Sequence, residues 1–506
     1  MSQLKKLAGD TVWYGVSSIL GRVLNYLLTP LYTGIFLPGD FGIMTELYAY
    51  VAFFNVIYIY GMETAYFRFA TRHKGDQQSY FNLSVSTMLL TSLGLSLALS
   101  LMAHPITNAL GYSGQEQIVY WLAAIMAIDS IFALPFAKLR LLGKPRRFAT
   151  IRMTTVIVTI LLNLFFLVFC QDVIDGKYMT EHKGLVETIY QPGFAVQYVF
   201  LSNLLANSLL VVLLASQFKG FRFTFDRIKF KPMLVYGLPI MIMSIAATTN
   251  EMLSRALLKY VLPEGFYAHL TNMEALGIFG SCYKLSIFMM LGVQAFRYAA
   301  EPFFFSKAEQ SDSPELFSNV MKGFVIFNSV VFLAVTVNLE VLGVIFLRNP
   351  VYREGIFIVP FLLMGYFFFG IFYNLSVWFK ITDKTKYGAI ITAAGAVITI
   401  VLNLFLIPIL GYFGSALATL FTYFFMCAFN YYYGQKHHPI PYKTGNAFFY
   451  IILSSTLGYL FYIIDIENVF LNIVLKNSAV LLLALIIYVM ERKHIKGKKV
   501  FGWVVP

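Results

Sequence analysis

Runs of about twenty apolar residues recur along almost the whole of this 506-residue chain. A helix rises about 1.5 Å per residue, so each run is long enough to cross a hydrocarbon core of about 30 Å. Inside a bilayer the backbone must satisfy its own hydrogen bonds, which favours helices. The sequence therefore predicts an all-α polytopic membrane protein with fourteen spans, at residues 8–35, 41–67, 82–103, 117–137, 150–170, 194–216, 233–260, 276–300, 322–346, 356–379, 388–407, 412–433, 447–464 and 469–490.

Lysine and arginine are distributed asymmetrically between the two sides of these spans. If the N-terminus is cytoplasmic, the cytoplasmic segments hold 28 of the 38 Lys and Arg residues and the opposite segments hold four. Cytoplasmic loops carry such an excess of positive charge. We therefore predict that both termini lie in the cytoplasm. The same loops account for the net charge of +13, so no nucleic-acid partner is expected.

Composition and motifs argue against several other classes of protein. Only 12% of the residues are charged, and the longest predicted outer loop, residues 171–193, is too short for a catalytic or receptor domain. No G-x-x-x-x-G-K-[ST] loop occurs, so the chain does not hydrolyse nucleotide itself. The three cysteines show neither metal-ligand nor disulfide spacing. We expect no metal centre and no organic cofactor.

A heptapeptide repeat indicates an internal duplication. Residues 159–165 read Thr-Ile-Leu-Leu-Asn-Leu-Phe and residues 399–405 read Thr-Ile-Val-Leu-Asn-Leu-Phe, each after a basic connector. A weaker match aligns Phe41-Gly42-Ile43 with Leu276-Gly277-Ile278. The heptapeptides are six spans apart, so the halves enter the membrane in the same direction, as in transporters with parallel repeats.

This duplication predicts three parts. Residues 1–220 form an N-terminal lobe of spans 1–6, and residues 221–433 form a C-terminal lobe of spans 7–12. The two six-helix lobes are related by a pseudo-two-fold axis along the membrane normal. Residues 434–506 add two helices without counterparts and a basic cytoplasmic tail. Pro239, near the start of span 7, marks a bend that is either functional or structural.

Three features together resemble the multidrug/oligosaccharidyl-lipid/polysaccharide (MOP) exporter superfamily, and within it the polysaccharide (O-antigen type) flippases. They are the opening Lys-Leu-Ala-Gly-Asp-Thr-Val-Trp-Tyr-Gly at residues 6–15, the basic connector before each Asn-Leu-Phe helix, and Gly-Tyr-Phe-Gly-Ser-Ala-Leu-Ala-Thr at residues 411–419. Fourteen spans are similar to the lipid II flippase rather than to twelve-span drug exporters.

The resemblance implies a transport function by alternating access. The substrate would be an undecaprenyl-diphosphate-linked oligosaccharide moved from the inner to the outer leaflet. Its head would pass through a central cavity while its tail stays among membrane lipids, with spans 13 and 14 lining a groove for the tail. The resemblance also implies an ion, Na⁺ or H⁺, as a coupling partner, and we expect the protein to function as a monomer.

Ionisable residues inside spans are costly and are therefore functional candidates. A diphosphate head needs fixed positive charge, and arginine suits it through bidentate donation. The candidate substrate ligands are Arg22, Arg255, Lys284 and Arg297. Arg22 is the first choice, and the alternative is that Arg22 and Asp129 simply neutralise each other.

The remaining charges are candidates for partners or gates, namely Asp129, Glu251, Glu63 and Glu340. Glu251, Arg255 and Lys259 share one face of span 7, which cannot point at lipid. Lys259 and Lys476 are expected to extend to the headgroups. Arg297 either contacts substrate or pairs with Glu63 or Glu301 as an inner gate.

The resemblance to the lipid II flippase also implies a possible sodium site. Asn403 and Thr419 match two of the ligands in that family, with Asn250 or Glu251 standing for a third. The pattern departs where a second acid is expected, because Ile407 occupies that position. The favoured alternative is that Asn403, like Asn163 at the same repeat position, forms hydrogen bonds between helices.

Two other functions remain open. A drug or cation antiporter of the same superfamily could use Asp129, although Arg22 would repel cationic drugs. A polytopic glycan polymerase or acyltransferase usually needs a large outer loop or a histidine within the membrane, and the sequence has neither.

Overall fold

The computed structural model describes residue 15 and residues 19–191, 195–307, 313–464, 466–495, 499–500 and 503–504. The opening motif at residues 6–14 lies outside these residues. Contacts divide the chain into two compact units, Met1–Gly277 and Ile278–Pro506, and the division falls within helix α13 (Asn272–Leu285). The lobe boundaries at residues 220 and 433 follow the sequence repeat, so they remain predictions.

The predicted fold class, a polytopic all-α membrane protein, is confirmed. The described residues contain twelve helices long and apolar enough to span a membrane, or thirteen if one bent pair counts as a single span. Every predicted span from the second onward corresponds to such a helix or helix pair. Of the first predicted span, residues 19–26 and α2 (Thr29–Ile35) are described and helical.

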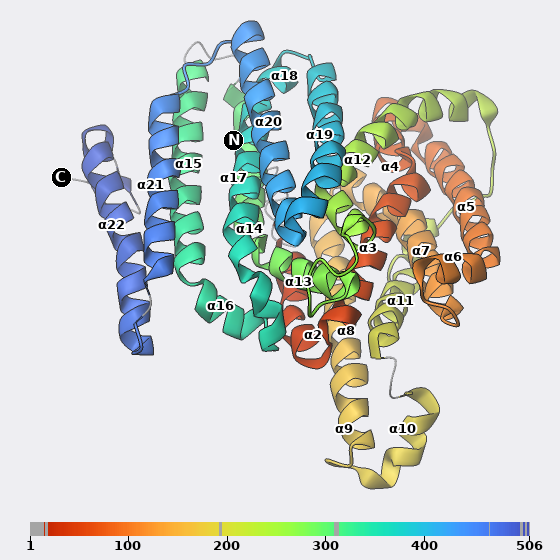
Figure 1. The fold of residues 1–506 in the computed structure, drawn as a ribbon. Coiled ribbons are helices and arrows are strands. Elements are labelled where there is room, and N and C mark those ends of the chain that lie inside the picture. Colours follow the sequence, from red (N-terminus) through yellow and green to blue (C-terminus); the bar gives the residue numbers. More distant parts are fainter. Residues whose placement is uncertain are drawn as a thin grey trace. The chain divides into compact units, whose positions relative to one another are not determined.

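Unit 1 contains the helices from α2 to α12 and the beginning of α13 (Figure 1). After α2 come α3 (Pro38–Ile59), α4 (Met62–Arg72), α5 (Gln77–Leu101), α6 (Ala103–Leu110), α7 (Glu116–Leu141), α8 (Pro145–Leu164), α9 (Gln171–Ile174), α10 (Lys183–Ile189), α11 (Ala195–Leu213) and α12 (Arg227–Val261). Short 3₁₀ turns lie at Lys74–Asp76, Thr180–His182 and Ala215–Phe218, and a π-helical turn at Phe165–Cys170 continues α8. The small helices α9 and α10 form the longest predicted outer loop.

Unit 2 continues from α13 with a second set of long helices. They are α14 (Ile287–Lys307), α15 (Ser313–Val337), α16 (Leu339–Phe346), a 3₁₀ segment (Pro350–Ile358), α17 (Val359–Leu375), α18 (Val377–Ile381), α19 (Lys386–Leu410), α20 (Tyr412–His437), α21 (Thr444–Ile463) and α22 (Val469–Ile495). Two antiparallel strands of two residues each, β1 (Lys499–Val500) and β2 (Trp503–Val504), follow near the C-terminus.

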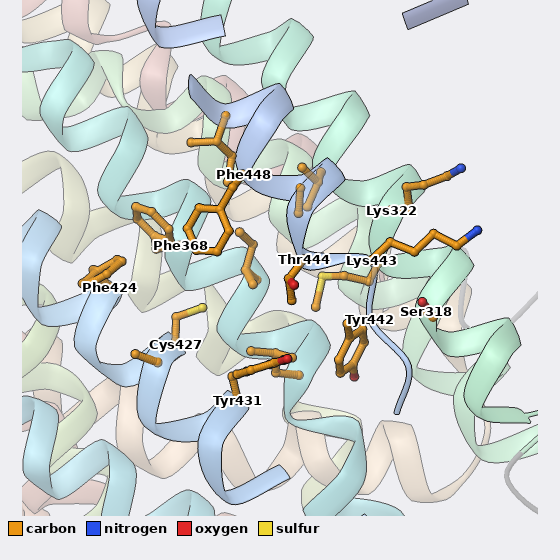
Figure 2. Close-up of a pocket in the computed structure, with 17 residues that line it drawn as sticks. Ser318, Lys322, Phe368, Phe424, Cys427, Tyr431, Tyr442, Lys443, Thr444 and Phe448 are labelled. Atoms are coloured by element: carbon orange, nitrogen blue, oxygen red, sulfur yellow. The ribbon is translucent and has the colours of Figure 1, made fainter. Parts of the chain in front are cut away.

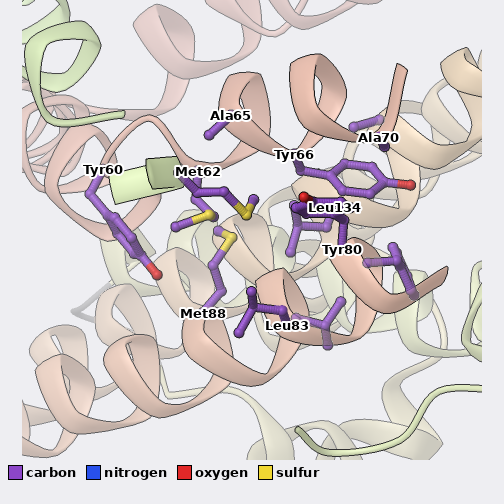
Figure 3. Close-up of a cluster of buried hydrophobic side chains, with 13 residues drawn as sticks. Tyr60, Met62, Ala65, Tyr66, Ala70, Tyr80, Leu83, Met88 and Leu134 are labelled. Atoms are coloured by element: carbon purple, nitrogen blue, oxygen red, sulfur yellow. The ribbon is translucent and has the colours of Figure 1, made fainter. Parts of the chain in front are cut away.

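The best-defined core of unit 1 lies where α4, α5 and α7 meet the beginning of α12. Figure 3 shows Met62 and Met88 next to each other and the ring of Tyr66 between neighbouring helices. Tyr66 packs edge-on against Phe81 of α5, with 5.7 Å between ring centroids. Met233 brings α12 into the same cluster. Flexible methionine and large aromatic side chains fill the irregular space between crossing helices.

The second span is broken, and the break packs against α12. Tyr60 and Gly61 both have positive φ, +36° and +75°, so the helix is interrupted between α3 and α4. A Cβ at Gly61 would lie 2.3 Å from the carbonyl oxygen of Gly237, so only glycine allows this approach. Pro239 follows two residues later inside α12, which continues as one helix but changes direction along its course (Figure 1).

The two glycines aligned by the weaker repeat lie against each other. A Cβ added to Gly277 would lie 1.8 Å from the carbonyl oxygen of Pro38 and 3.0 Å from the amide nitrogen of Gly42. A Cβ added to Gly42 would lie 2.2 Å from the carbonyl oxygen of Met273. The beginnings of α3 and α13 therefore touch through backbone, which a larger residue at either position would prevent.

The last long helix, α22, is held in unit 2 by two ion pairs. Lys476 of α22 lies 2.8 Å from Glu340 of α16, and its side chain is only 4% exposed. Glu491, near the other end of α22, pairs with Lys322 of α15. The expectation that Lys476 extends to the headgroups is therefore wrong, because a carboxylate on a neighbouring helix neutralises it inside the unit.

Replacing Gly61 with alanine should destabilise the protein by about 2 kcal/mol or more, because the new Cβ meets the Gly237 carbonyl and a non-glycine residue is strained at this φ. Gly94→Ala in α5 is the control, since its added Cβ has no neighbour within 4 Å. Thermal unfolding of the detergent-purified variants measures both. Equal melting temperatures for the two variants would show that the backbone contact is not required.

Candidate substrate-binding site

One face of α12 brings several of the predicted charges together in unit 1. Tyr26, in the helical stretch 19–26, lies within electrostatic range of Arg22, Glu251 and Arg255. Glu251 and Arg255 are one helical turn apart, and Arg255 Nη2 donates to the backbone oxygen of Glu251 at 2.9 Å. Two of the four predicted phosphate ligands, Arg22 and Arg255, thus belong to one cluster.

Arg22 and Asp129 have different surroundings in the described structure. Arg22 is exposed on its helix. The Asp129 carboxylate accepts a 3.0 Å hydrogen bond from Asn207 of α11 and lies within electrostatic range of Arg152 of α8. Arg152 in turn stacks over the ring of Phe136, 4.3 Å from its centroid. Among the described residues, then, Arg152 rather than Arg22 is the cation that acts on the Asp129 carboxylate.

Lys259 belongs to a buried network at the end of α12. Its ammonium lies 3.2 Å from Glu46 Oε2, and Glu46 is fully buried on α3. Three tyrosines also donate to this carboxylate: Tyr260 at 2.7 Å, Tyr50 at 3.2 Å, and Tyr112 through a short hydrogen bond. The expectation that Lys259 reaches the headgroups is therefore wrong, because a carboxylate in unit 1 pairs with it.

The remaining bonds of Lys259 fix it in place. Its ammonium donates to the Leu110 carbonyl at 2.7 Å and lies about 5 Å from the rings of Tyr112 and Tyr260. The sequence analysis did not include Glu46 among the candidate site residues. Its position within an apolar span was a usable signal, because a buried acid requires a cation nearby. The network ties α3 to α12, which are spans 2 and 7 of the two predicted lobes.

The other predicted charges are held in separate pairs. In unit 1, Glu63 of α4 pairs with Arg140 of α7. In unit 2, Glu301 pairs with Lys380 at 2.6 Å, and Arg297 donates to the Tyr373 hydroxyl at 3.2 Å while lying over its ring.

These pairs bear on the proposed inner gate. Glu63 and Glu301 each have a cation other than Arg297 as a close partner. Arg297, Glu301 and Lys380 line one small hollow together with aromatic side chains. Lys284 lies half-buried on α13, two residues before the break at Ser286 where the helix pair α13–α14 bends by 43°.

The repeated asparagines make matching hydrogen bonds between helices. Asn163 accepts from the Tyr32 hydroxyl at 2.9 Å and donates to the Thr159 carbonyl at 2.8 Å. Asn403 accepts from the Ser415 hydroxyl at 3.2 Å and donates to the Thr399 carbonyl at 2.8 Å. The interhelical role predicted for both residues is confirmed.

These bonds limit what Asn403 can offer to a sodium ion. Thr419 also points its hydroxyl at the Ser415 carbonyl, and Ile407 supplies no carboxylate. Sodium in proteins needs several hard oxygen ligands, usually with an acid among them. Asn250 and Glu251 lie on α12 in unit 1, whereas Asn403 and Thr419 lie in unit 2. The sodium site stays a prediction.

The chemistry available at the α12 cluster is that of an anion site. Arg22, Arg255 and Glu251 together carry one net positive charge. Guanidinium groups donate two parallel hydrogen bonds to phosphate oxygens and stay charged at any physiological pH. The Arg255 side chain at present donates to its own helix, and an incoming phosphate could replace that backbone acceptor.

The described helices define a polytopic all-α membrane protein. Comparison with solved structures gives the particular fold. The chain is similar to the lipid II flippase MurJ in an inward closed conformation, with a TM-score of 0.71 and 13% identity over 96% of this chain and 100% of that one.

Multidrug MATE transporters share the fold over a smaller part of this chain. An inward-facing MATE transporter of the MOP superfamily has a TM-score of 0.57 and 14% identity, covering 85% of this chain and 93% of its own. A variant of the MATE transporter VcmN from Vibrio cholerae has a TM-score of 0.57 and 12% identity, with 87% and 99% coverage. No sequence family and no curated protein sequence matches the chain. The resemblance indicated by the sequence is thus confirmed at the level of the fold.

Removing the positive charge of Lys259 from the Glu46 network should destabilise the protein far more than removing an exposed positive charge. Lys259→Met leaves a buried carboxylate without its counter-charge and should reduce stability by about 3 kcal/mol. Adding Glu46→Gln to Lys259→Met should restore much of this loss, because no buried charge then remains.

The matched control is Lys177→Met, which breaks the exposed pair of Lys177 with Asp172 and should leave the melting temperature unchanged. Melting temperature and membrane abundance are measured for all variants. If Lys259→Met behaves like Lys177→Met, the network does not stabilise the fold.

Proposed function

We propose that this protein is a flippase that moves an undecaprenyl-diphosphate-linked oligosaccharide from the inner to the outer leaflet of the bacterial cytoplasmic membrane. The observation that carries the proposal is that Arg22 and Arg255 both lie within electrostatic range of Tyr26. Both residues lie inside predicted spans, where an arginine is costly and usually either pairs with another group or has a functional role. A diphosphate group matches their charge and their donor geometry.

The architecture supports a lipid-linked substrate over a small soluble one. The fold likeness to the lipid II flippase includes nearly the whole chain, whereas the likeness to the MATE transporters leaves about a seventh of it uncovered. In this chain α22 is joined to α15 and α16 by the pairs of Lys322 with Glu491 and of Lys476 with Glu340. Tyr450 of α21 donates to Glu491 at 2.8 Å, which joins α21 to the same group. We propose that these helices shelter the lipid tail while the head crosses.

The proposed cycle is alternating access with the basic loops on the cytoplasmic side. The diphosphate binds Arg22 and Arg255 from the cytoplasmic leaflet, and the lobes then rock to open the outer side. Opening the outer side requires α3 and α12 to separate, so the network of Glu46 and Lys259 would have to break in that state. The driving force is an ion gradient, the membrane potential or consumption of the product outside.

A cation-exporting antiporter is the second candidate. It would use Asp129 as its acid, but Arg152 lies within electrostatic range of this carboxylate and competes with a cationic substrate. The positive charge of Arg22 and Arg255 opposes such a substrate as well. These two observations favour the flippase.

Arg22→Ala and Arg255→Ala should each abolish transport while leaving membrane abundance close to that of the unaltered protein. Arg22→Lys should retain part of the activity, because the charge remains but bidentate donation is lost. Arg222→Ala, which removes an exposed arginine from a loop of the same unit, is the control. Complementation of a deletion strain measures function, and full activity of Arg22→Ala would remove the proposal.

A deletion strain distinguishes the candidate functions directly. Loss of a flippase should trap lipid-linked oligosaccharide in the inner leaflet, where extraction of carrier lipids and sugar analysis also identify the glycan. Loss of an antiporter should instead sensitise cells to cationic compounds with carrier lipids unchanged. Loss of a polymerase or acyltransferase should leave an unmodified acceptor outside the membrane.

A further inference from the structure

Unit 2 contains an apolar pocket that the proposed transport cycle does not use. It has a volume of about 370 Å³ and lies among α15, α17, α20 and the beginning of α21. Figure 2 shows Phe368, Phe424 and Phe448 gathered at one end and the side chains of Lys322 and Lys443 extending side by side at the other. A pocket of this size and lining suits part of an acyl chain.

The pocket opens onto the surface of the spanning helices. Phe448 is 53% exposed and Phe424 is 37% exposed, although both line the pocket. In a membrane protein such a surface faces hydrocarbon, so a lipid chain can enter from the side without crossing water. The apolar wall therefore continues directly into the bilayer.

The basic end of the pocket offers an anion site with two parts. Lys443 is exposed, and no carboxylate among the described residues pairs with it. Helix α21 begins at Thr444 without a side-chain cap. The Thr444 N–H donates to the Tyr442 carbonyl at 2.9 Å, so the next N–H groups of the first turn and the positive end of the helix dipole lie beside Lys443. The hydroxyl of Tyr442 is buried at the pocket wall and points away from the Lys443 ammonium (Figure 2).

Lys322 lies at the same end of the pocket, but an ion pair neutralises its charge. It pairs with Glu491, which also accepts a 2.8 Å hydrogen bond from Tyr450. Because Glu491 neutralises Lys322, Lys443 supplies the net positive charge at the basic end of the pocket. Both lysines lie in segments that the charge asymmetry places on the cytoplasmic side, at the level where phospholipid headgroups lie.

We propose that this pocket binds one acyl chain of an anionic bilayer phospholipid, whose phosphate is held by Lys443 and the first turn of α21. Basic pockets between spanning helices on the cytoplasmic side bind anionic headgroups in this way. The bound lipid would brace α21 against α15 and α20. The site is separate from Arg22 and Arg255, so it does not depend on which substrate is transported.

Native mass spectrometry of the purified full-length protein tests this assignment. Phosphatidylglycerol, phosphatidylcholine and a polyprenyl phosphate are added separately to the delipidated protein. The unaltered protein should bind phosphatidylglycerol more tightly than phosphatidylcholine. Lys443→Gln should weaken binding of phosphatidylglycerol about five-fold and leave binding of phosphatidylcholine unchanged.

Two further variants separate the pocket from general surface charge. Ala447→Phe fills the pocket and should reduce binding of both phospholipids, with an unchanged melting temperature as evidence of folding. Lys386→Gln removes an exposed lysine from the predicted cytoplasmic end of α19 and should change nothing. Equal binding of the two phospholipids, no effect of Lys443→Gln, or binding of the polyprenyl phosphate alone would each overturn the proposal.

Discussion

A charged side chain within a membrane span must have a partner, and this requirement organises both units. Glu46 of α3 is satisfied by Lys259 of α12 and by three tyrosines. Lys476 of α22 is satisfied by Glu340, and Glu491 by Lys322. Each of these pairs joins helices distant in sequence. Removing one member leaves a buried charge, so the pairs specify which helices pack together as well as adding stability.

The candidate site differs from these pairs in its balance of charge. Arg22, Arg255 and one acid, Glu251, all lie within electrostatic range of Tyr26. The structural pairs combine one cation with one anion each. An excess of guanidinium inside predicted spans is what recognition of a phosphate group requires. Lys259 of the Glu46 network lies on the same face of α12, eight residues after Glu251. A motion of this helix would therefore move both the Glu46 network and the candidate site.

Much of the fold was predictable because its signals are local. Apolar runs locate the helices, and the order of basic segments indicates their direction in the membrane. The repeated Asn-Leu-Phe segments predicted equivalent helices, and Asn163 and Asn403 do make matching bonds to a threonine carbonyl one turn earlier. The partners of the charges were not predictable. Lys259 and Lys476 were expected in the headgroups because the carboxylates that neutralise them lie 213 and 136 positions earlier in the chain.

By itself, the sequence determined that this is a polytopic helical membrane protein with a duplicated set of spans, because hydropathy and periodicity act over about twenty residues. It also determined which ionisable residues lie inside those spans, where burying a charge is energetically unfavourable. Only the tertiary structure decided that Gly61 abuts Gly237, that α3 breaks there, and which acid meets which base. Those contacts join helices far apart in the chain, and their geometry depends on how whole helices cross, which no local pattern encodes.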